Sequence, residues 1–203
     1  MTASNCPFSK VHSLVFLIFN VVLSMVTNSC DNGYIPKPRA YFRIDLPEKQ
    51  YIRLDSIYPY SFEYPVYAVV VPDTFSYSGK NWINLHFPAF KGILHISYKE
   101  VNDNLNSYLE DSRNLVVKHI PKASAINEVL FINKNAKVYG LLYEIKGSTA
   151  ASPYQFYVTD STNHFVRGSL YFYVTPNNDS LSPVIDFIHE DIDHMINTFE
   201  WRD

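Results

Sequence analysis

The 203-residue chain has few cysteines and few glycines, and each shortage excludes a class of function. Of its two cysteines, Cys6 lies in the expected export signal, so Cys30 would remain alone and could form no disulfide within the exported chain. Six scattered glycines provide no phosphate-cradling loop, which argues against nucleotide chemistry. Lys and Arg number 17 against 20 Asp and Glu, and no basic stripe alternates with aromatic residues, so no nucleic-acid partner is expected.

The chain also lacks an apolar run long enough to span a bilayer, which takes about 20 residues. Its longest run, LVFLIFNVVLSMV at 14–26, follows Lys10 and precedes Thr-Asn-Ser-Cys at 27–30, the layout of a cleaved export signal. Small residues before a cysteine resemble the lipobox of bacterial lipoproteins, in which the thiol is acylated and becomes the mature amino terminus. Cys30 is therefore the predicted lipidation site.

Ordinary secretion is the alternative to lipidation. Thr27 occupies the place where a lipobox usually has an aliphatic residue, and Thr-Asn-Ser also fits a cleavage site after Ser29. Lipidation is favoured because a cysteine at the first mature position has no disulfide partner, and because acyl chains hold a protein durably on a membrane.

The predicted lipidation at Cys30 divides the chain into three parts. Residues 1–29 are the predicted signal peptide, residues 30–40 are the lipidated cysteine with an extended tether, and 41–203 form one domain. The tether is polar and carries Pro36 and Pro38, which favour an extended backbone. A chain of this length can bury roughly 70% of its unfolded surface in one core.

The domain is expected to be α+β. Period-two patterns bounded by turn residues predict strands, and helical spacing predicts one helix over 104–119 and another from the Ser182-Pro183 start to the end. Short turns between successive strands predict a single antiparallel sheet packed with two main helices, similar to the αβα sandwich of PsbP and Mog1. The predicted strands are 41–46, 51–55, 68–71, 82–87, 93–99, 128–133, 137–146, 155–159 and 165–174.

Two polar clusters contain residue types that bind metals or act in catalysis. His189 and His194 lie five residues apart, about 140° around a helix, so one metal ion cannot easily take both, and no metal is assigned. Asp160, Ser161 and His164 provide a carboxylate, a hydroxyl and an imidazole, but neighbours in sequence rarely form a triad, and this run is typical of a turn. No catalytic residue and no cofactor is assigned.

Other sequence features suggest binding. His86 and His95, each on a predicted strand, are expected to donate hydrogen bonds to backbone carbonyls.

Tyrosine and arginine are favoured in interface cores, and several of these residues lie just after the tether in the sequence. The predicted partner-binding residues are Arg39, Tyr41, Phe42, Arg43 and Tyr51.

Several longer runs together resemble the gliding motility lipoprotein GldD family of Bacteroidota, over essentially the whole mature chain. They are PKPRAYFRIDLPEK (36–49), YSFEYP (60–65), LEDSR (109–113), TDST (159–162), RGSLYF (167–172) and TFEW (198–201). The resemblance implies an envelope lipoprotein required for gliding and for the linked type IX secretion system, with no known enzymatic activity.

The expected function is a non-catalytic accessory or assembly factor. Its expected partners are the membrane, through an N-terminal lipid that includes palmitate, and other gliding or type IX secretion proteins, with no small-molecule substrate. The lipid would lie in the inner or the outer membrane, with the domain in the periplasm. The rival is a periplasmic hydrolase or ligand-binding module built around His164, Asp160 and Ser161, or around a pocket near His86 and Trp82.

Overall fold

The structure, a computed structural model, describes residues 14–20, 44–54, 57–75 and 79–202. Residues 14–20 are helical. No helix in these ranges combines the length and the apolar character needed to cross a bilayer. Cys30 and the tether lie outside the described residues.

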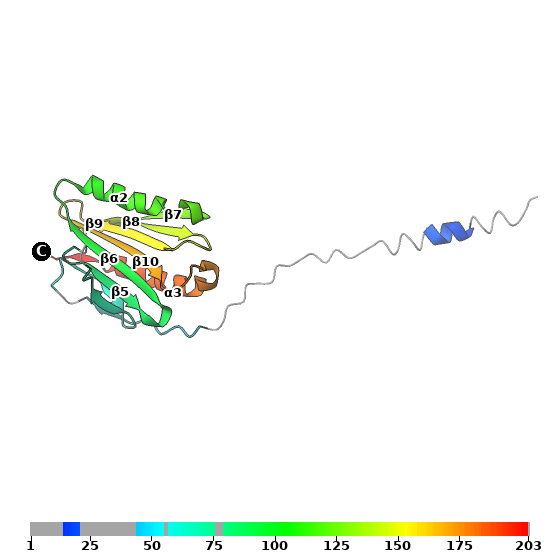
Figure 1. Cartoon of the computed structure of the whole chain (residues 1–203), viewed down its shortest axis with the longest axis horizontal. Helices are drawn as coiled ribbons and strands as arrows, with labels where there is room; N and C mark the ends of the chain where they lie inside the picture. The colour runs from blue at the N-terminus through cyan, green and yellow to red at the C-terminus, as the bar shows by residue number, and fades with distance from the viewer. Residues whose placement is uncertain (1–13, 21–43, 55–56, 76–78, 203) are drawn as a thin grey trace, which may run out of the picture. The chain divides into compact units, whose positions relative to one another are not determined.

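A seven-stranded antiparallel sheet forms the centre of the domain, in the order β4-β5-β6-β10-β9-β8-β7 (Figure 1). Its two long central strands, β6 and β10, pair over nine residues each, from His164 opposite Glu100 to Phe172 opposite Gly92. The strands are β4 (Val69–Pro72), β5 (Ile83–Phe87), β6 (Gly92–Glu100), β7 (Ala125–Asn133), β8 (Val138–Lys146), β9 (Tyr154–Thr159) and β10 (His164–Phe172).

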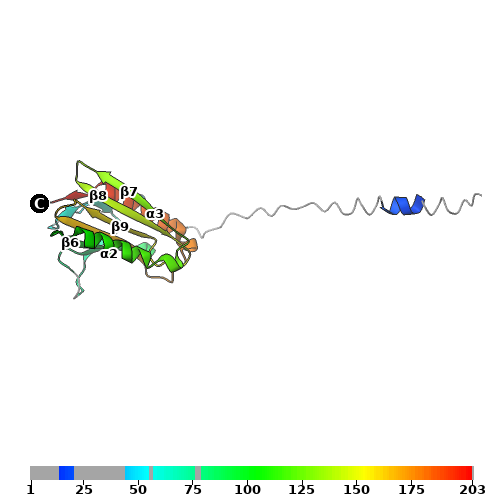
Figure 2. The same ribbon diagram turned by 90° about the horizontal axis from the view of Figure 1, so that it is seen from above.

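Two helices cover opposite faces of this sheet, as Figures 1 and 2 show. Helix α2 (Leu105–Val117) carries the chain from central strand β6 to edge strand β7, and it packs its buried Val116 against Tyr143 and Ile145 of β8. Helix α3 (Asn178–Asn197) buries Ile188 and Ile192 in the larger core. The result is a three-layer αβα arrangement, which confirms the predicted α+β class.

The two cores follow from strand alternation. Along β6, Leu94, Ile96 and Tyr98 are buried toward α3, while the alternate side chains of the strand face the α2 side. The α3 core also takes aromatic rings from both ends of the domain, since Phe62 and Phe199 stack with their ring centroids 6.0 Å apart. It therefore joins elements that are far apart in the chain.

Two small strand pairs complete the domain. β1 (Tyr51–Arg53) pairs with β3 (Glu63–Pro65), and β2 (Tyr60–Ser61) pairs with β11 (Glu200–Trp201). The sequence predicted β1, as the strand at 51–55, but it did not predict the other three. Those three strands have only two or three residues each, too short to produce a recognisable alternation in sequence. Short 3-10 turns lie at Pro88–Phe90 and Ile120–Lys122.

Two predictions were wrong, one of a strand and one of the start of a helix. The predicted strand at 41–46 is not found over 44–46, where the chain is irregular, and 41–43 lie outside the described residues. The last helix begins at Asn178, one turn before Ser182-Pro183. Asn177 is its N-cap, accepting from the Ser180 backbone N–H, so the earlier cap determines the start and Pro183 lies inside the helix.

A buried carboxylate ties the start of the domain to α3. Asp191 is 2% exposed, and it accepts hydrogen bonds from Lys49 Nζ at 2.8 Å, Tyr51 Oη at 3.0 Å and Tyr67 Oη at 2.5 Å. Lys49 Nζ also lies 3.7 Å from the centre of the Phe187 ring. Burial first, and then the hydrogen bond to Asp191, raise the pKa of Tyr51 and Tyr67 above the ordinary tyrosine range, so both hydroxyls stay protonated as donors.

Removing this carboxylate should strongly destabilise the domain. Asp191→Ala would leave the Lys49 ammonium partly buried without its nearest anion and two hydroxyls without an acceptor, and breaking such a buried pair costs about 3–5 kcal/mol. Equilibrium urea denaturation should therefore show a large loss in the free energy of unfolding. Glu190→Gln is the matched control, because Glu190 lies 3.5 Å from Lys49 Nζ but is exposed, and it should cost less than about 1 kcal/mol. Equal losses for the two variants would contradict the assignment.

Candidate functional site

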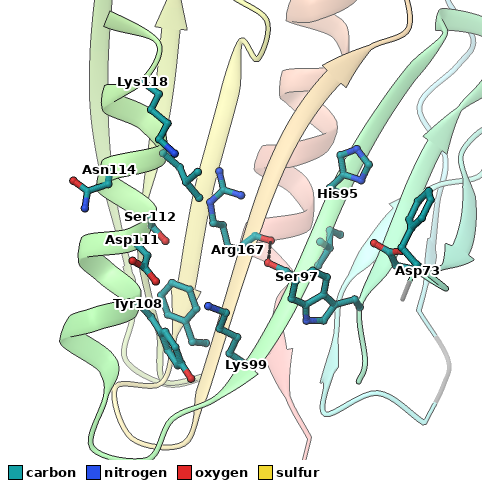
Figure 3. Close-up of a pocket in the computed structure, with 15 residues that line it drawn as sticks. Asp73, His95, Ser97, Lys99, Tyr108, Asp111, Ser112, Asn114, Lys118 and Arg167 are labelled. Carbon is teal, nitrogen blue, oxygen red and sulfur yellow. Dashed lines mark hydrogen bonds between the residues drawn. The ribbon is translucent and has the colours of Figure 1, made fainter. Parts of the chain in front are cut away.

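A concave feature lies on the sheet face that α2 covers only in part. Helix α2 packs over β9 and β10, and the neighbouring surface of β6 is left open beside it. Figure 3 shows the resulting groove, with side chains of α2 on one side, His95 and Asp73 on the other, and Arg167 between them. Its volume is about 890 Å³, within the range of ligand pockets in proteins.

Strand and helix periodicity explain why these side chains meet. His95, Ser97 and Lys99 alternate along β6 on the α2 side of the sheet, and Phe165 and Arg167 do the same along the paired strand β10. From α2, residues three, four or seven apart reach the same groove. They are Tyr108, Asp111, Ser112, Leu115 and Lys118.

Arg167 is held in place by a chain of neutral groups. Its guanidinium donates to Gln155 Oε1, and Gln155 is 1% exposed. Gln155 Nε2 lies 2.9 Å from His119 Nε2. Burial and then the positive charge of Arg167 lower the pKa of His119 below its ordinary value, so the ring is neutral and accepts from the Gln155 amide.

His95 is a second neutral ring at the groove. Its Nδ1 donates to Asn84 Oδ1 at 2.6 Å, so its partner is a side-chain amide, and the expectation of a backbone carbonyl is corrected. Burial lowers the pKa of His95 below its ordinary value; Asp73 opposes this shift, while His86 and Arg167 add to it. A neutral imidazole with its Nδ1 hydrogen committed has one free nitrogen lone pair.

The 160–163 run forms a turn between β9 and β10. Asp160 Oδ1 accepts from the backbone N–H groups of Thr162, Asn163 and His164 at 2.8–3.0 Å, so the carboxylate organises its own loop. His164 Nδ1 lies 2.8 Å from Tyr98 Oη, and its ring stacks on Trp201. Asp160 and His164 line a hollow of about 360 Å³, but Ser161 does not, so the three groups are not gathered as a triad.

The helix histidines have separate partners. His189 Nε2 lies 3.5 Å from Asp193 Oδ1 and has no hydrogen bond, and its ring stacks on Tyr154. His194 Nε2 lies 2.7 Å from Glu63 Oε2. No group of three or more His, Cys, Asp or Glu side chains within the described ranges is placed to hold a metal ion.

Only one of the predicted partner-binding residues can be located. Tyr51 donates to Asp191 and stacks on His194 at 3.7 Å between ring centroids, so its ring is used inside the domain. Arg39, Tyr41, Phe42 and Arg43 lie outside the described residues, as does Cys30, the predicted lipidation site.

The groove residues were missed because no local motif marks them. Trp82 does lie at the groove, as the rival reading expected, but the histidine beside it is His95 and not His86. One signal was present: Arg167 lies between Val166 and Gly168 in the middle of a strand that contains no other Lys, Arg, Asp or Glu. A charged residue in a central strand is unusual, and such a residue points to a site or to a buried pair.

The turn assignment can be tested through Asp160. Asp160→Ala removes the acceptor of three backbone N–H groups and should lower the free energy of unfolding by about 1–2 kcal/mol, whereas Asp160→Asn keeps an acceptor oxygen and should cost less. Glu110→Ala, an exposed change on α2, is the control and should be nearly neutral. Urea denaturation would measure all three, and a neutral Asp160→Ala would contradict the assignment.

The same carboxylate predicts a pH dependence. Burial raises the pKa of Asp160, but hydrogen bonds from His164, Thr162 and Asn163 outweigh it, so the pKa lies below its ordinary value. The ionised group therefore stabilises the fold above its unfolded pKa of about 3.9, and this stabilisation is lost as the pH falls through the lower, folded value. The difference in the free energy of unfolding between wild type and Asp160→Asn should therefore become smaller as the pH falls through that range.

Comparison with known proteins places the chain in a family. No curated protein matches it. The solution structure of cyanobacterial PsbP (CyanoP) from Synechocystis sp. PCC 6803 is similar over 79% of this chain and 97% of that one, with 11% sequence identity and a TM-score of 0.47. The family model for the gliding motility lipoprotein GldD matches residues 31–201. This chain belongs to the gliding motility lipoprotein GldD family.

Proposed function

We propose that this protein is a membrane-anchored, non-catalytic accessory or assembly factor for gliding motility and the linked type IX secretion system of Bacteroidota. The observation that carries the proposal is the family match over 31–201, which begins at the residue directly after Cys30. A lipid on Cys30, palmitate included, would confine the domain to a membrane surface. The domain would face the periplasm from the inner or the outer membrane and act through the proteins that it contacts.

The polar clusters support a non-catalytic role. Asp160 is committed to its own turn, His164 to Tyr98 and Trp201, and Ser161 does not line the adjacent hollow. A hydrolase would need a nucleophile within hydrogen-bond reach of a base. The groove beside α2 is the feature that favours the alternative of a ligand-binding module.

Edge strand β7 is the described surface best suited to a protein partner. It has nine residues and no proline, and Glu128 is its only charged residue. Val129, Leu130 and Ile132 are 46%, 65% and 55% exposed, and they project from both faces of the strand. Proteins usually protect such an edge, because its free backbone groups can pair with another strand.

The opposite edge of the sheet is protected. Strand β4 has only four residues and ends at Pro72, and short length and proline both limit edge pairing. The contrast supports one occupant for β7, an extended apolar segment of another envelope protein added as an eighth strand. The predicted partner-binding residues Arg39, Tyr41, Phe42, Arg43 and Tyr51, called the arm from here on, are the second proposed contact.

Replacing the anchor residue tests the membrane attachment. Cys30→Ser should abolish labelling by a palmitate analogue and move the protein from the membrane to the soluble fraction, because the acceptor thiol is gone. Cys6→Ser, inside the expected signal, is the matched control and should change neither result. A wild-type protein that is soluble with a free thiol at Cys30 would refute the anchor.

Site-specific photo-cross-linking tests the partner surface. A photoreactive amino acid at Leu130 should cross-link to a gliding or type IX secretion protein in intact cells, because this side chain is exposed on the open edge. The same group at Val69, which is 50% exposed on β4, is the control and should give no such product. A third placement, at Tyr41, tests the arm. If neither the Leu130 nor the Tyr41 variant cross-links to a gliding or type IX secretion protein, the assembly role is contradicted.

A further inference from the structure

We propose that the groove beside α2 binds the carboxylate group of an organic acid with an apolar or aromatic body, with Arg167 as the anion-binding group. This site is separate from the β7 edge, and the proposal does not depend on the assembly role. It rests on an unpaired cation, on the charges around it and on the apolar groove walls.

Arg167 is a half-buried cation with no anionic partner among the described residues. It lies on central strand β10, and within the described ranges no carboxylate oxygen comes within 4.0 Å of its guanidinium. Arginine in such a position is normally paired with an acid, since its desolvation is otherwise uncompensated. Among the described residues, the guanidinium donates to the neutral amide oxygen of Gln155. A ligand carboxylate would supply the missing charge.

The guanidinium is also held ready for a ligand. Gln155 is almost completely buried and is itself held by His119, so the hydrogen bond to Arg167 restrains the arginine side chain. Arginine has five N–H donors, and the bond to Gln155 uses one of them. Two parallel N–H donors match the two oxygens of a carboxylate, which a lysine cannot do. Restraint before binding lowers the entropy lost on association.

The charges of the groove favour a singly charged anion. Besides Arg167 it contains Lys99 and Lys118, neither of which has an ion pair within the described part of the chain. Lys99 Nζ lies 4.4 Å from the centre of the Tyr108 ring. Asp73 and Asp111 also line the groove, so three cations face two carboxylates. This small excess favours one negative charge, and the two acidic groups would repel a dianion such as phosphate.

The walls favour an apolar body on the ligand. The ring of Tyr108 on α2 packs against the ring of Phe165 on β10, with their centroids 5.5 Å apart. Leu115 and Trp82 also line the groove. Ligand pockets are largely apolar, with a few polar groups that orient the ligand. A volume of about 890 Å³ accommodates a small aromatic acid or the last residues of a peptide.

Titration of the full chain with 4-phenylbutyrate tests the proposal by NMR. The indole N–H of Trp82 should shift saturably, because this side chain lines the groove, while the indole of Trp201, outside it, serves as an internal reference. The neutral amide of the same acid should bind at least about tenfold more weakly. Equal binding of acid and amide, or no saturable shift with any carboxylate probe, would overturn the proposal.

Variants assign the binding to Arg167. Arg167→Met should weaken 4-phenylbutyrate binding by about tenfold or more, while Arg113→Gln, on the same helix as the groove wall but not lining it, should leave it unchanged. Lys118→Gln, at an exposed position, is the second variant in case Arg167→Met fails to fold. It should weaken 4-phenylbutyrate binding about two- to fivefold. Unaltered binding by a folded Arg167→Met variant would refute the site. If Arg167→Met does not fold, unaltered binding by Lys118→Gln would refute it.

Two probes distinguish the sources of the carboxylate. An N-acetylated tripeptide ending in phenylalanine is compared with 4-phenylbutyrate, and its C-terminal amide is the control. Tighter binding of the free peptide supports the site and identifies a peptide C-terminus as the source, whereas tighter binding of 4-phenylbutyrate supports it and identifies a free acid. Inorganic phosphate that competes as strongly as either carboxylate would overturn the proposal, because the site would then be a general anion site.

Discussion

The buried Asp191 carboxylate is the interaction on which the two ends of the domain depend. Its partners Lys49 and Tyr51 lie 142 and 140 residues away in the chain, and Tyr67 lies 124 residues away. An isolated carboxylate in this place would be very costly, so the lysine and the two hydroxyls must be present together. The contact holds the start of the domain against α3.

The groove follows from how the crossover helix lies on the sheet. α2 connects central strand β6 to edge strand β7, and it packs its apolar residues over β8 to β10. The face of β6 beside it is left without a covering helix (Figure 3). An ordinary core would place apolar side chains there. This chain has Arg167 and His95 instead, each hydrogen-bonded to a buried side-chain amide, which is consistent with the proposed anion site.

Two described surfaces carry the proposed binding roles. β7 presents an open sheet edge, and the groove beside α2 presents an arginine without an ion pair among the described residues. Both are features of a protein that acts by binding, which is the role proposed for this chain. The unequal edges of the sheet point the same way, since β4 is short and ends at Pro72 while β7 is long and apolar.

By itself, the sequence determined the fold class, the long strands, both main helices and the family. These depend on local periodicity, as in the alternation along 83–87, and on composition, which any one segment carries within itself. The tertiary structure alone decided that Asp191 is buried against Lys49, and that Arg167 meets Gln155 and the side chains of α2. Such contacts join residues whose positions are set by pairing and packing across the whole domain. No local pattern encodes them, because their energy exists only once the chain has folded.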